Sequence, residues 1–301
     1  MTLRPPNDGD FDAMLALMNA HQLAAFGEAD VTVEELRLWL TAPSVDVERD
    51  IRLLERDGRL VGYIDVDPNE DTPPRWWCDL KIDPQDDADA VAGELVSWLE
   101  QRVDEGVLRV WTAAGDARVV GALERLGFAP VRHSYRMEID LTGDEREPVW
   151  PEGLSLRTVS DENERLVYDL VKEVWRDTSD PMDETFEEWQ HWTTKSEAFE
   201  PTLWFLALDR EDVAGFSLCR RDPNDSNAGY VATLGVRRRW RRQGLGEALL
   251  LHSFREFRSR GFARATLGVD ASSPTGATRL YERAGMRVYR DTVFLERPVQ
   301  S

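Results

Sequence analysis

Short apolar runs alternate with amphipathic segments along the second half of the chain. The runs at 202–209 and 213–220 are separated by three turn-forming residues, which predicts two strands joined as a hairpin. Other apolar runs predict further strands, at 154–159, 230–236, 263–270 and 288–296. Helix-like segments separate these strands, at 162–175, 183–193, 244–260 and 275–284. Strands interleaved with helices predict an α/β fold with helices on both faces of a sheet.

This pattern occurs twice in the chain. Three pairs of segments match at one spacing of 153 residues: LRPPNDGD with LRTVSDEN from Leu156, TVEELRLW with TFEEWQHW from Thr185, and GRLVGYIDV with EDVAGFSLC around Gly215. A fourth pair, LERLGFAPVRHSYRME and YERAGMRVYRDTVFLE, matches at a spacing of 158. Repetition at a nearly constant spacing indicates homologous units. The sequence therefore predicts two domains, 1–145 and 150–301, joined around the charged segment 142–153.

Composition and charge narrow the class of protein. Hydrophobic residues make up 42% of the 301 residues, enough for a packed core, and no run approaches the roughly 18 apolar residues of a membrane span. The formal net charge is −20, of which residues 1–148 carry −17, and such a surface repels nucleic-acid phosphates. Two cysteines are too few for a disulfide framework or a cysteine-ligated metal site. With no secretory signal at the N-terminus, we expect a cytoplasmic protein without a nucleic-acid, membrane or metal partner.

Five arginines lie within residues 237–242, between the run Thr233–Val236 and the segment Gln243-Gly244-Leu245-Gly246. A helix N-terminus exposes unpaired N–H groups, and glycines let a phosphate approach the backbone. Arginines add charge-assisted hydrogen bonds. This strand-to-helix turn therefore predicts a pyrophosphate site. It matches neither a P-loop, which needs Lys-Ser or Lys-Thr after the glycines, nor a G-x-G-x-x-G fingerprint, because Leu249 stands at the third glycine.

The segment 241–246 resembles the acetyl-CoA-binding signature [QR]-x-x-G-x-[GA] of the GNAT superfamily of acyl-CoA-dependent N-acyltransferases. A second family segment of the form LYE(K/R)xGF is similar to Leu280-Tyr281-Glu282-Arg283-Ala284-Gly285-Met286. Both segments fall in the expected order and on the expected elements. The resemblance implies two tandem GNAT-like domains, each a mixed, mainly antiparallel sheet flanked by helices.

The resemblance also implies which residues would contact acetyl-CoA. The pantetheine arm would lie along the backbone of residues 234–236, with the Val236 N–H donating to the thioester carbonyl, and residues 241–246 would hold the pyrophosphate. Ser273 stands near a position where many members carry Asn. The implied contact residues are Leu234, Gly235, Val236, Arg241, Arg242, Gln243, Gly244, Leu245, Gly246 and Ser273.

Tyr281 matches the tyrosine that commonly protonates the departing CoA thiolate in this family. The chemistry agrees, because a phenol with a pKa near ~10 can donate a proton to a thiolate. The alternative is an aromatic side chain that packs the last helix on the sheet. The strand 230–236 carries no carboxylate to act as base, which leaves Asp270 and Asp222 as candidates; either residue could instead cap a turn, and an amine that binds neutral needs little base help.

The first repeat lacks these features. Its segment 80–95, LKIDPQDDADAVAGEL, places four aspartates where the second repeat has arginines, at Asp83, Asp86, Asp87 and Asp89. Leu123 stands where Tyr281 does in the second repeat. Like charges repel a pyrophosphate by as much as opposite charges attract it. We expect residues 1–145 to keep a GNAT-like shape without binding CoA in the usual way, and a second working site with unusual ligands is the alternative.

The expected activity is transfer of an acetyl or similar acyl group from acetyl-CoA to a primary amine of a small molecule, by direct attack in a ternary complex. The early helices of the second repeat suggest the acceptor side, with Trp175, Asp177, Asp180, Trp189 and Trp192, although Trp192 mirrors Trp39 and favours a packing role. A non-catalytic acyl-CoA sensor is the alternative class. The tandem layout is similar to that of mycothiol synthase and related two-domain acetyltransferases, in layout more than in residues. The sequence leaves homodimerisation open.

Overall fold

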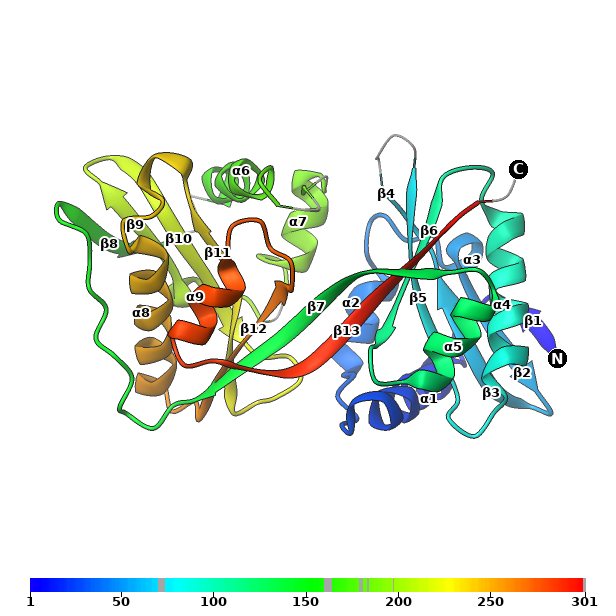
Figure 1. Cartoon of the computed structure of the whole chain (residues 1–301). Helices are drawn as coiled ribbons and strands as arrows, with labels where there is room; N and C mark the ends of the chain where they lie inside the picture. The colour runs from blue at the N-terminus through cyan, green and yellow to red at the C-terminus, as the bar shows by residue number, and fades with distance from the viewer. Residues whose placement is uncertain (70–73, 160–163, 179–180, 183, 197, 300–301) are drawn as a thin grey trace. The chain divides into compact units, whose positions relative to one another are not determined.

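The structure is a computed structural model that describes all residues except 70–73, 160–163, 179–180, 183, 197 and 300–301 (Figure 1). The chain forms two compact units, one made of residues 1–134 with 290–301 and the other of residues 135–289. In the described part of the chain, no helix is long and apolar enough to cross a membrane.

The first unit contains a sheet with strand order β1-β2-β3-β5-β6-β13, and β4 pairs with β5 beside it. Its strands are β1 (Thr2–Arg4), β2 (Ile51–Arg56), β3 (Arg59–Asp65), β4 (Asp67–Asn69), β5 (Arg75–Ile82), β6 (Val107–Ala113) and most of β13 (Arg287–Pro298). Its helices are α1 (Phe11–Phe26), α2 (Val33–Leu40), α3 (Val47–Asp50), α4 (Ala88–Arg102) and α5 (Ala117–Arg125).

The second unit contains a sheet with strand order β7-β12-β11-β10-β9-β8. Its strands are the second half of β7 (Ala129–Asp140), β8 (Leu154–Thr158), β9 (Trp204–Asp209), β10 (Asp212–Arg221), β11 (Ala228–Val236) and β12 (Arg264–Asp270). Its helices are α6 (Glu164–Trp175), α7 (Phe186–Trp192), α8 (Leu245–Ser259) and α9 (Ala277–Arg283), with short 3₁₀ turns η2 (Pro201–Leu203) and η3 (Arg238–Trp240).

Both units are mixed, mainly antiparallel sheets flanked by helices, which confirms the fold expected from the sequence. The pairs β5–β6 and β11–β12 are parallel. Strand pairs such as β2–β3, β9–β10 and β10–β11 are antiparallel. A parallel pair needs a crossover connection, and α4 and α8 supply it (Figure 1).

The compact units do not follow the repeat boundaries, because the closing strand of each repeat joins the other unit. Strand β13 closes the second repeat but pairs with β6 of the first unit, from Thr292 opposite Ala113 to Pro298 opposite Val107. Strand β7 closes the first repeat, yet its residues 135–140 lie beside β12 in the second unit. The division at 1–145 and 150–301 therefore separates each sheet from one of its own strands. The repeat pattern could not reveal this, because both closing strands have similar sequences and fit either sheet.

Helices cover both faces of the second unit's sheet. On one face α8 packs closely, since a Cβ on Gly229 would come within 2.3 Å of the Phe257 ring and the Ser217 and Ser253 hydroxyls lie 2.8 Å apart. On the other face, α6 and α7 pack against β9 and β10 in a separate buried cluster that includes Leu218. Side chains of β11 alternate between these two faces.

Candidate active site

Strands β11 and β12 pair over only the first half of β11. The parallel register joins Ala228–Val231 to Arg264–Leu267, whereas the rest of β11 pairs with β10 alone among the described residues. A bulge at Ala232 lies at this point, because Val231 and Thr233 face consecutive residues of β10. A β-bulge bends the strand and increases its local twist. The second half of β11 therefore presents an unpaired edge.

The N–H groups of Leu234 and Val236 belong to this edge. The Arg237 N–H donates to the Ala214 carbonyl at 3.0 Å, which makes those two residues a hydrogen-bonded pair of β10 and β11. Hydrogen-bonded and non-hydrogen-bonded positions alternate along an antiparallel ladder. Val236 and Leu234 therefore occupy non-hydrogen-bonded positions, and their N–H groups point away from β10 toward the β12 side.

Helix α8 begins where β11 and its turn end, and its start has no side-chain cap. Gly244 at its N-cap has φ +88°, a left-handed conformation that favours glycine. Gly246 is different, because a Cβ there would make only ordinary contacts, 3.5 Å from Leu280 and 3.6 Å from Val236. Packing therefore does not require glycine at 246. The first N–H groups of α8 lack intrahelical acceptors, as at any helix start, so the turn fits an anion.

Four of the five turn arginines contact carboxylates of the protein itself, and the loosest of these contacts is the 4.0 Å pair of Arg239 with Asp212. The other three are held more closely. Arg237 Nε lies 2.9 Å from Glu173 of α6, and Arg238 Nε lies 2.9 Å from Asp177 just beyond α6. Arg241 pairs with Asp177 at 2.7 Å, and its Nε donates to the Val236 carbonyl at 2.8 Å. These arginines therefore brace the turn against α6 as well as adding positive charge to it.

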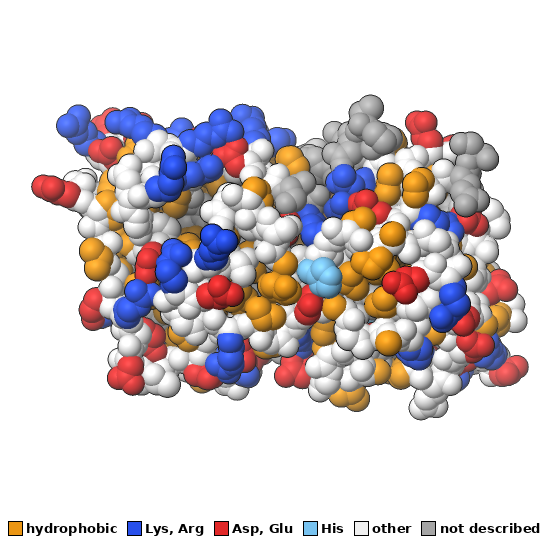
Figure 2. All heavy atoms as spheres, viewed as in Figure 1, with side chains coloured by type: hydrophobic (Ala, Val, Ile, Leu, Met, Phe, Trp, Pro, Cys, Tyr) orange, Lys and Arg blue, Asp and Glu red, His pale blue; other side chains and the backbone are white. Residues whose placement is uncertain are grey.

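Asp177 is the centre of this network. Its hydrogen bonds to Arg238 and then Arg241 hold the pKa of the Asp177 carboxyl well below its usual range. Arg242, in contrast, has an exposed side chain with no hydrogen bond or ion pair among the described residues. Its φ of +60° follows the tight path of the turn. Figure 2 shows basic side chains gathered over this turn and the neighbouring end of α6.

Tyr281 lies on α9, 7% exposed, within the buried cluster beneath α8. Burial, with a smaller contribution from Tyr230, raises the pKa of Tyr281 to about 12. Among the described residues its hydroxyl has no hydrogen-bond partner. The side chain therefore packs the helix and also carries a protonated phenol. A packing role and a proton-donor role for Tyr281 are thus compatible.

Ser273 and Asp270 form one turn between β12 and α9. The Asp270 carboxylate accepts hydrogen bonds from the Ser272 N–H and hydroxyl, both at 2.8 Å. The Ser273 N–H donates to the Asp270 carbonyl at 3.0 Å, and its hydroxyl lies 2.9 Å from that of Thr275. Asp270 thus caps a turn at the end of β12, which is one of the two roles that the sequence suggested for it.

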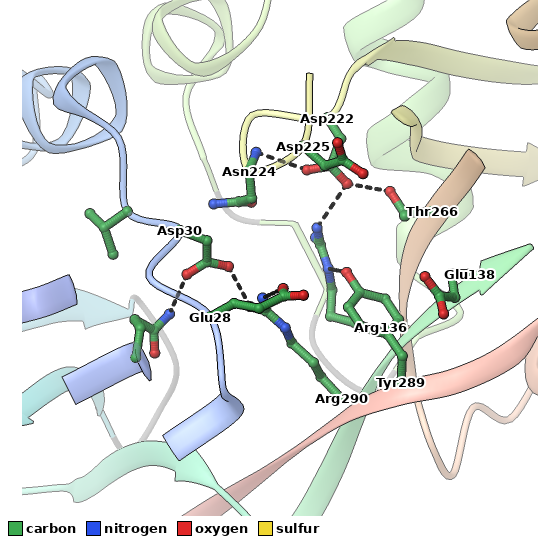
Figure 3. Close-up of polar contacts among 12 residues, drawn as sticks. Glu28, Asp30, Arg136, Glu138, Asp222, Asn224, Asp225, Thr266, Tyr289 and Arg290 are labelled. Atoms are coloured by element: carbon green, nitrogen blue, oxygen red, sulfur yellow. Dashed lines mark hydrogen bonds and ion pairs between the residues drawn. The ribbon is translucent and has the colours of Figure 1, made fainter. Parts of the chain in front are cut away.

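Asp222, the other candidate base, lies at the opposite end of β11 from Val236. It is 2% exposed and accepts hydrogen bonds from the Thr266 hydroxyl and the Asn224 N–H, while Arg136 lies 3.3 Å away (Figure 3). Three donors therefore hold this carboxylate at the closed end of the β11–β12 pair, away from Val236.

The residues that the sequence suggested for the acceptor side have different surroundings in the structure. Trp189 is 4% exposed and belongs to the core under α6 and α7, and Trp192 is partly buried. Asp177 is occupied by the turn arginines, and Asp180 lies outside the described residues. Trp175, at 37% exposure, is the most exposed aromatic of this group.

The first unit repeats the strand geometry. The parallel register of β5 and β6 joins Arg75–Asp79 to Val107–Trp111, and β5 then continues to Ile82 along β3. The Asp83 N–H donates to a β3 carbonyl at 2.9 Å, so Ile82 occupies the position that Val236 has in the second unit. Both units therefore form the same unpaired strand edge.

In the first unit this edge is occupied by a side chain. His21 of α1 is 2% exposed, and its Nδ1 lies 3.2 Å from the Ile82 nitrogen and 3.1 Å from the Ile82 carbonyl oxygen. In the second unit, Arg241 contacts the carbonyl of Val236, and no described side chain contacts its N–H. The backbone donor that would face a thioester is thus already covered in the first unit.

The acidic turn of the first unit carries its own counter-ions. Asp83 and Asp86 both pair with Arg59 of β3, and Asp89 pairs with Arg125 of α5 at 2.5 Å. The charges are the reverse of those in the second unit, where arginines on the turn pair with carboxylates elsewhere. The first turn is therefore neutralised internally and has no excess positive charge for a phosphate.

His21 gives the first unit a measurable pH dependence. Burial, with a smaller effect of Lys81, lowers the pKa of His21 to about 3, whereas an unfolded histidine has a pKa of about 6.5. The unfolded chain therefore binds the extra proton, and His21 stabilises the fold above pH ~6.5 and loses this contribution as the pH falls toward 3. We expect the free energy of unfolding to fall by about 1.4 kcal/mol per pH unit in that window. Urea unfolding of His21→Gln from pH 7 to pH 4 should lack this slope, with His191→Gln as the matched control. Equal slopes in all three proteins would contradict the assignment.

Sequence reasoning missed two features of these sites. The partners of the turn arginines, Glu173 and Asp177, lie about sixty residues upstream, and no local motif links them to the turn. His21 lies in a helix of the first repeat with no sign of its contact with β5. Both pairings depend on which helix face packs on the sheet.

Comparison with known proteins agrees with this geometry. The profile of the Acetyltransferase (GNAT) family matches residues 166–286. The chain is 29% identical over 283 residues to a mycothiol acetyltransferase from Thermobispora bispora, covering 92% of each chain, and 27% identical over 259 residues to one from Saccharopolyspora erythraea, covering 79% of this chain and 82% of that one.

Two solved structures share the fold of the whole chain. A GCN5-related N-acetyltransferase from Sphaerobacter thermophilus is 30% identical with a TM-score of 0.80, covering 100% of this chain and 96% of that one. A tandem GNAT protein from the clavulanic acid biosynthesis pathway is 16% identical with a TM-score of 0.75, covering 100% and 99%, and this likeness concerns the fold alone. The chain belongs to the GNAT family of acetyltransferases, as an acyl-CoA-dependent enzyme with a tandem two-domain layout.

Proposed function

We propose that the second unit transfers an acetyl group from acetyl-CoA to the primary amine of a small molecule, by direct attack in a ternary complex. The observation that carries this proposal is the unpaired edge of β11, whose two free N–H groups lead directly to the uncapped start of α8. The pantetheine arm would lie along residues 234–236. The pyrophosphate would meet the α8 N–H groups at Gly246, where the missing side chain leaves room, with Arg242 as its cation.

Each proposed role follows from chemistry at a stated atom. The Val236 N–H would donate to the thioester carbonyl oxygen, where negative charge develops as the amine attacks. Tyr281 would give its phenolic proton to the sulfur as the carbon–sulfur bond breaks. With a pKa raised to about 12, this phenol stays protonated at neutral pH. Asp270 would be the nearby base for the amine proton, and an amine that binds neutral would give its proton to water instead.

We infer that the first unit does not bind CoA in this way. His21 covers the N–H that corresponds to Val236, and the acidic turn is paired internally. The contribution of the first repeat to activity would instead be structural, because it supplies the second half of β7 to the second sheet.

A second candidate names the acceptor. Four relatives that are 27–29% identical over most of the chain are mycothiol acetyltransferases. The amine of a mycothiol precursor is therefore the first acceptor to screen. Acetylation of this amine would follow the mechanism proposed above, since only the attacking amine differs.

Calorimetric titration of acetyl-CoA tests the site. We expect one binding site per chain in the native protein and a loss of at least about tenfold in affinity in Gly246→Asp with Arg242→Glu. An aspartate in the first turn favours the helix, and Arg242 has no partner among the described residues, so folding should be kept. Arg59→Glu in the first unit would be the matched charge reversal, with no expected effect on binding. Two sites, or one site that survives the double change, would contradict the division of labour between the units.

A further inference from the structure

Four side chains from four strands form one polar row across the second unit's sheet. The register places Arg220 of β10 opposite Tyr230 of β11, and Tyr230 opposite Thr266 of β12. The Arg136 guanidinium of β7 lies 4.6 Å from the centre of the Tyr230 ring. This arginine–tyrosine row (Arg220, Tyr230, Thr266 and Arg136) lies on the face that α6 and α7 cover, because Leu218, two residues before Arg220, packs there.

Among the described residues, the two guanidinium groups of the row keep unused donors. Arg136 makes two long hydrogen bonds there, 3.4 Å to the Tyr289 hydroxyl and 3.3 Å to Asp222, although a guanidinium has five N–H donors (Figure 3). Arg220 lies 5.4 Å from the centre of the Tyr230 ring and has no ion pair in the described part of the chain. Tyr230 is thus contacted by two cations with donors to spare.

The carboxylates nearby are already paired. Asp222 pairs with Arg136 at 3.3 Å, Asp225 with Arg264 at 2.6 Å, and Glu138 with Arg287 at 2.8 Å. Of the two cations that contact Tyr230, Arg220 is therefore the one without a carboxylate partner in the described part of the chain. One unmatched positive charge on a partly covered sheet face fits a small anion.

The row also reaches the point where β11 and β12 separate. The Tyr230 hydroxyl lies 3.4 Å from the position that a Cβ would take on Gly268, the first residue of β12 after its pairing with β11 ends. Tyr230 is also near enough to Tyr281 to contribute to the raised pKa of that phenol. A molecule bound to the row by a carboxylate would place its amine at the start of the unpaired edge of β11.

We propose that Arg136 and Arg220 bind a carboxylate of the acceptor, so that the acceptor is an amino-acid-like molecule with both an amine and a carboxylate. This inference rests on the proposed function and names its substrate class. The planar fork of arginine matches the two oxygens of a carboxylate, and both cations approach the same ring. Arg136 comes from β7, so the strand that the first repeat supplies would determine specificity in the second unit.

The test compares matched acceptors that differ only in the anion. The panel pairs glycine with glycinamide, L-alanine with L-alaninamide, β-alanine with its amide, and phosphoethanolamine with ethanolamine. Two quantities are measured for each compound: kcat/KM from release of free CoA, and the Kd for the CoA-saturated protein by calorimetry. We expect at least one carboxylate to have a kcat/KM about tenfold or more higher than that of its amide, and a Kd lower by a similar factor.

Three variants separate specificity from folding. Arg220→Gln removes a cation that has no structural ion pair, and Arg136→Lys keeps the charge beside Asp222 but loses the planar fork. Each should lower the carboxylate preference about tenfold, with unchanged affinity for acetyl-CoA and an unchanged Tm. Arg221→Gln is the matched control, because Arg221 lies next to Arg220 but contacts Phe262, at 5.1 Å from the ring centre.

Each outcome separates the two proposals. The carboxylate proposal is overturned if no carboxylate binds better than its amide, if the preference survives both variants, or if phosphoethanolamine shows the only preference. If carboxylates bind the CoA-saturated protein but no compound releases CoA, the binding proposal stands and the amine-transfer proposal fails.

Discussion

Residues 150–301 produced alone are expected not to form a stable enzyme, although they contain every residue of the family signature. This fragment lacks residues 135–140 of β7, which lie beside β12 and bury Met137 completely in the core of the second unit. It also leaves residues 292–298 of β13 without their partner β6. An exposed strand edge favours aggregation. We expect no soluble monomer, as judged by size-exclusion chromatography and circular dichroism.

Coexpression of fragments 1–145 and 150–301 provides the control. Together they contain both exchanged strands, so we expect a soluble complex that binds acetyl-CoA with the affinity of the intact chain. A folded and active 150–301 fragment would show that β7 is dispensable and would contradict the strand exchange.

Tyr281→Phe is expected to lower kcat/KM by about 100- to 10,000-fold, the range typical of a lost general acid. The ring that packs in the core is kept, and only a hydroxyl without a hydrogen-bond partner among the described residues is removed. We therefore expect the affinity for acetyl-CoA, measured by calorimetry, and the Tm to remain close to those of the native protein.

The pH profile of the native enzyme checks the same role. Because the pKa of Tyr281 is raised to about 12, the acid stays protonated throughout the usual assay range. The rate should rise with pH as the acceptor amine loses its proton, and it should not fall again below pH ~10 through Tyr281. Full activity of Tyr281→Phe with a confirmed acceptor would rule out the proton-transfer role, and the side chain would then be a packing residue only.

The arginine turn shows how far local sequence can predict a site. The strand, the turn glycines and the helix start were all predictable, because each depends on residues close together in the chain. The partners of Arg237, Arg238 and Arg241 were not, because they lie on α6 and just beyond its end and are brought to the turn by packing. Arg242 is exposed and has no hydrogen bond or ion pair among the described residues. The sequence does not distinguish it from the other four arginines of the turn.

The sequence by itself determined the two repeats, the mixed sheets and the CoA signature, since periodicity, glycine positions and short motifs are local properties. Only the tertiary structure decided which sheet each closing strand joins, because β7 and β13 have similar patterns and either sheet could bury them. Tertiary packing likewise brought His21 to the Ile82 backbone and Arg136 to Tyr230. These contacts join residues far apart in the chain. Their energies depend on how deeply the side chains are buried and how closely they approach each other, which a local sequence pattern does not predict.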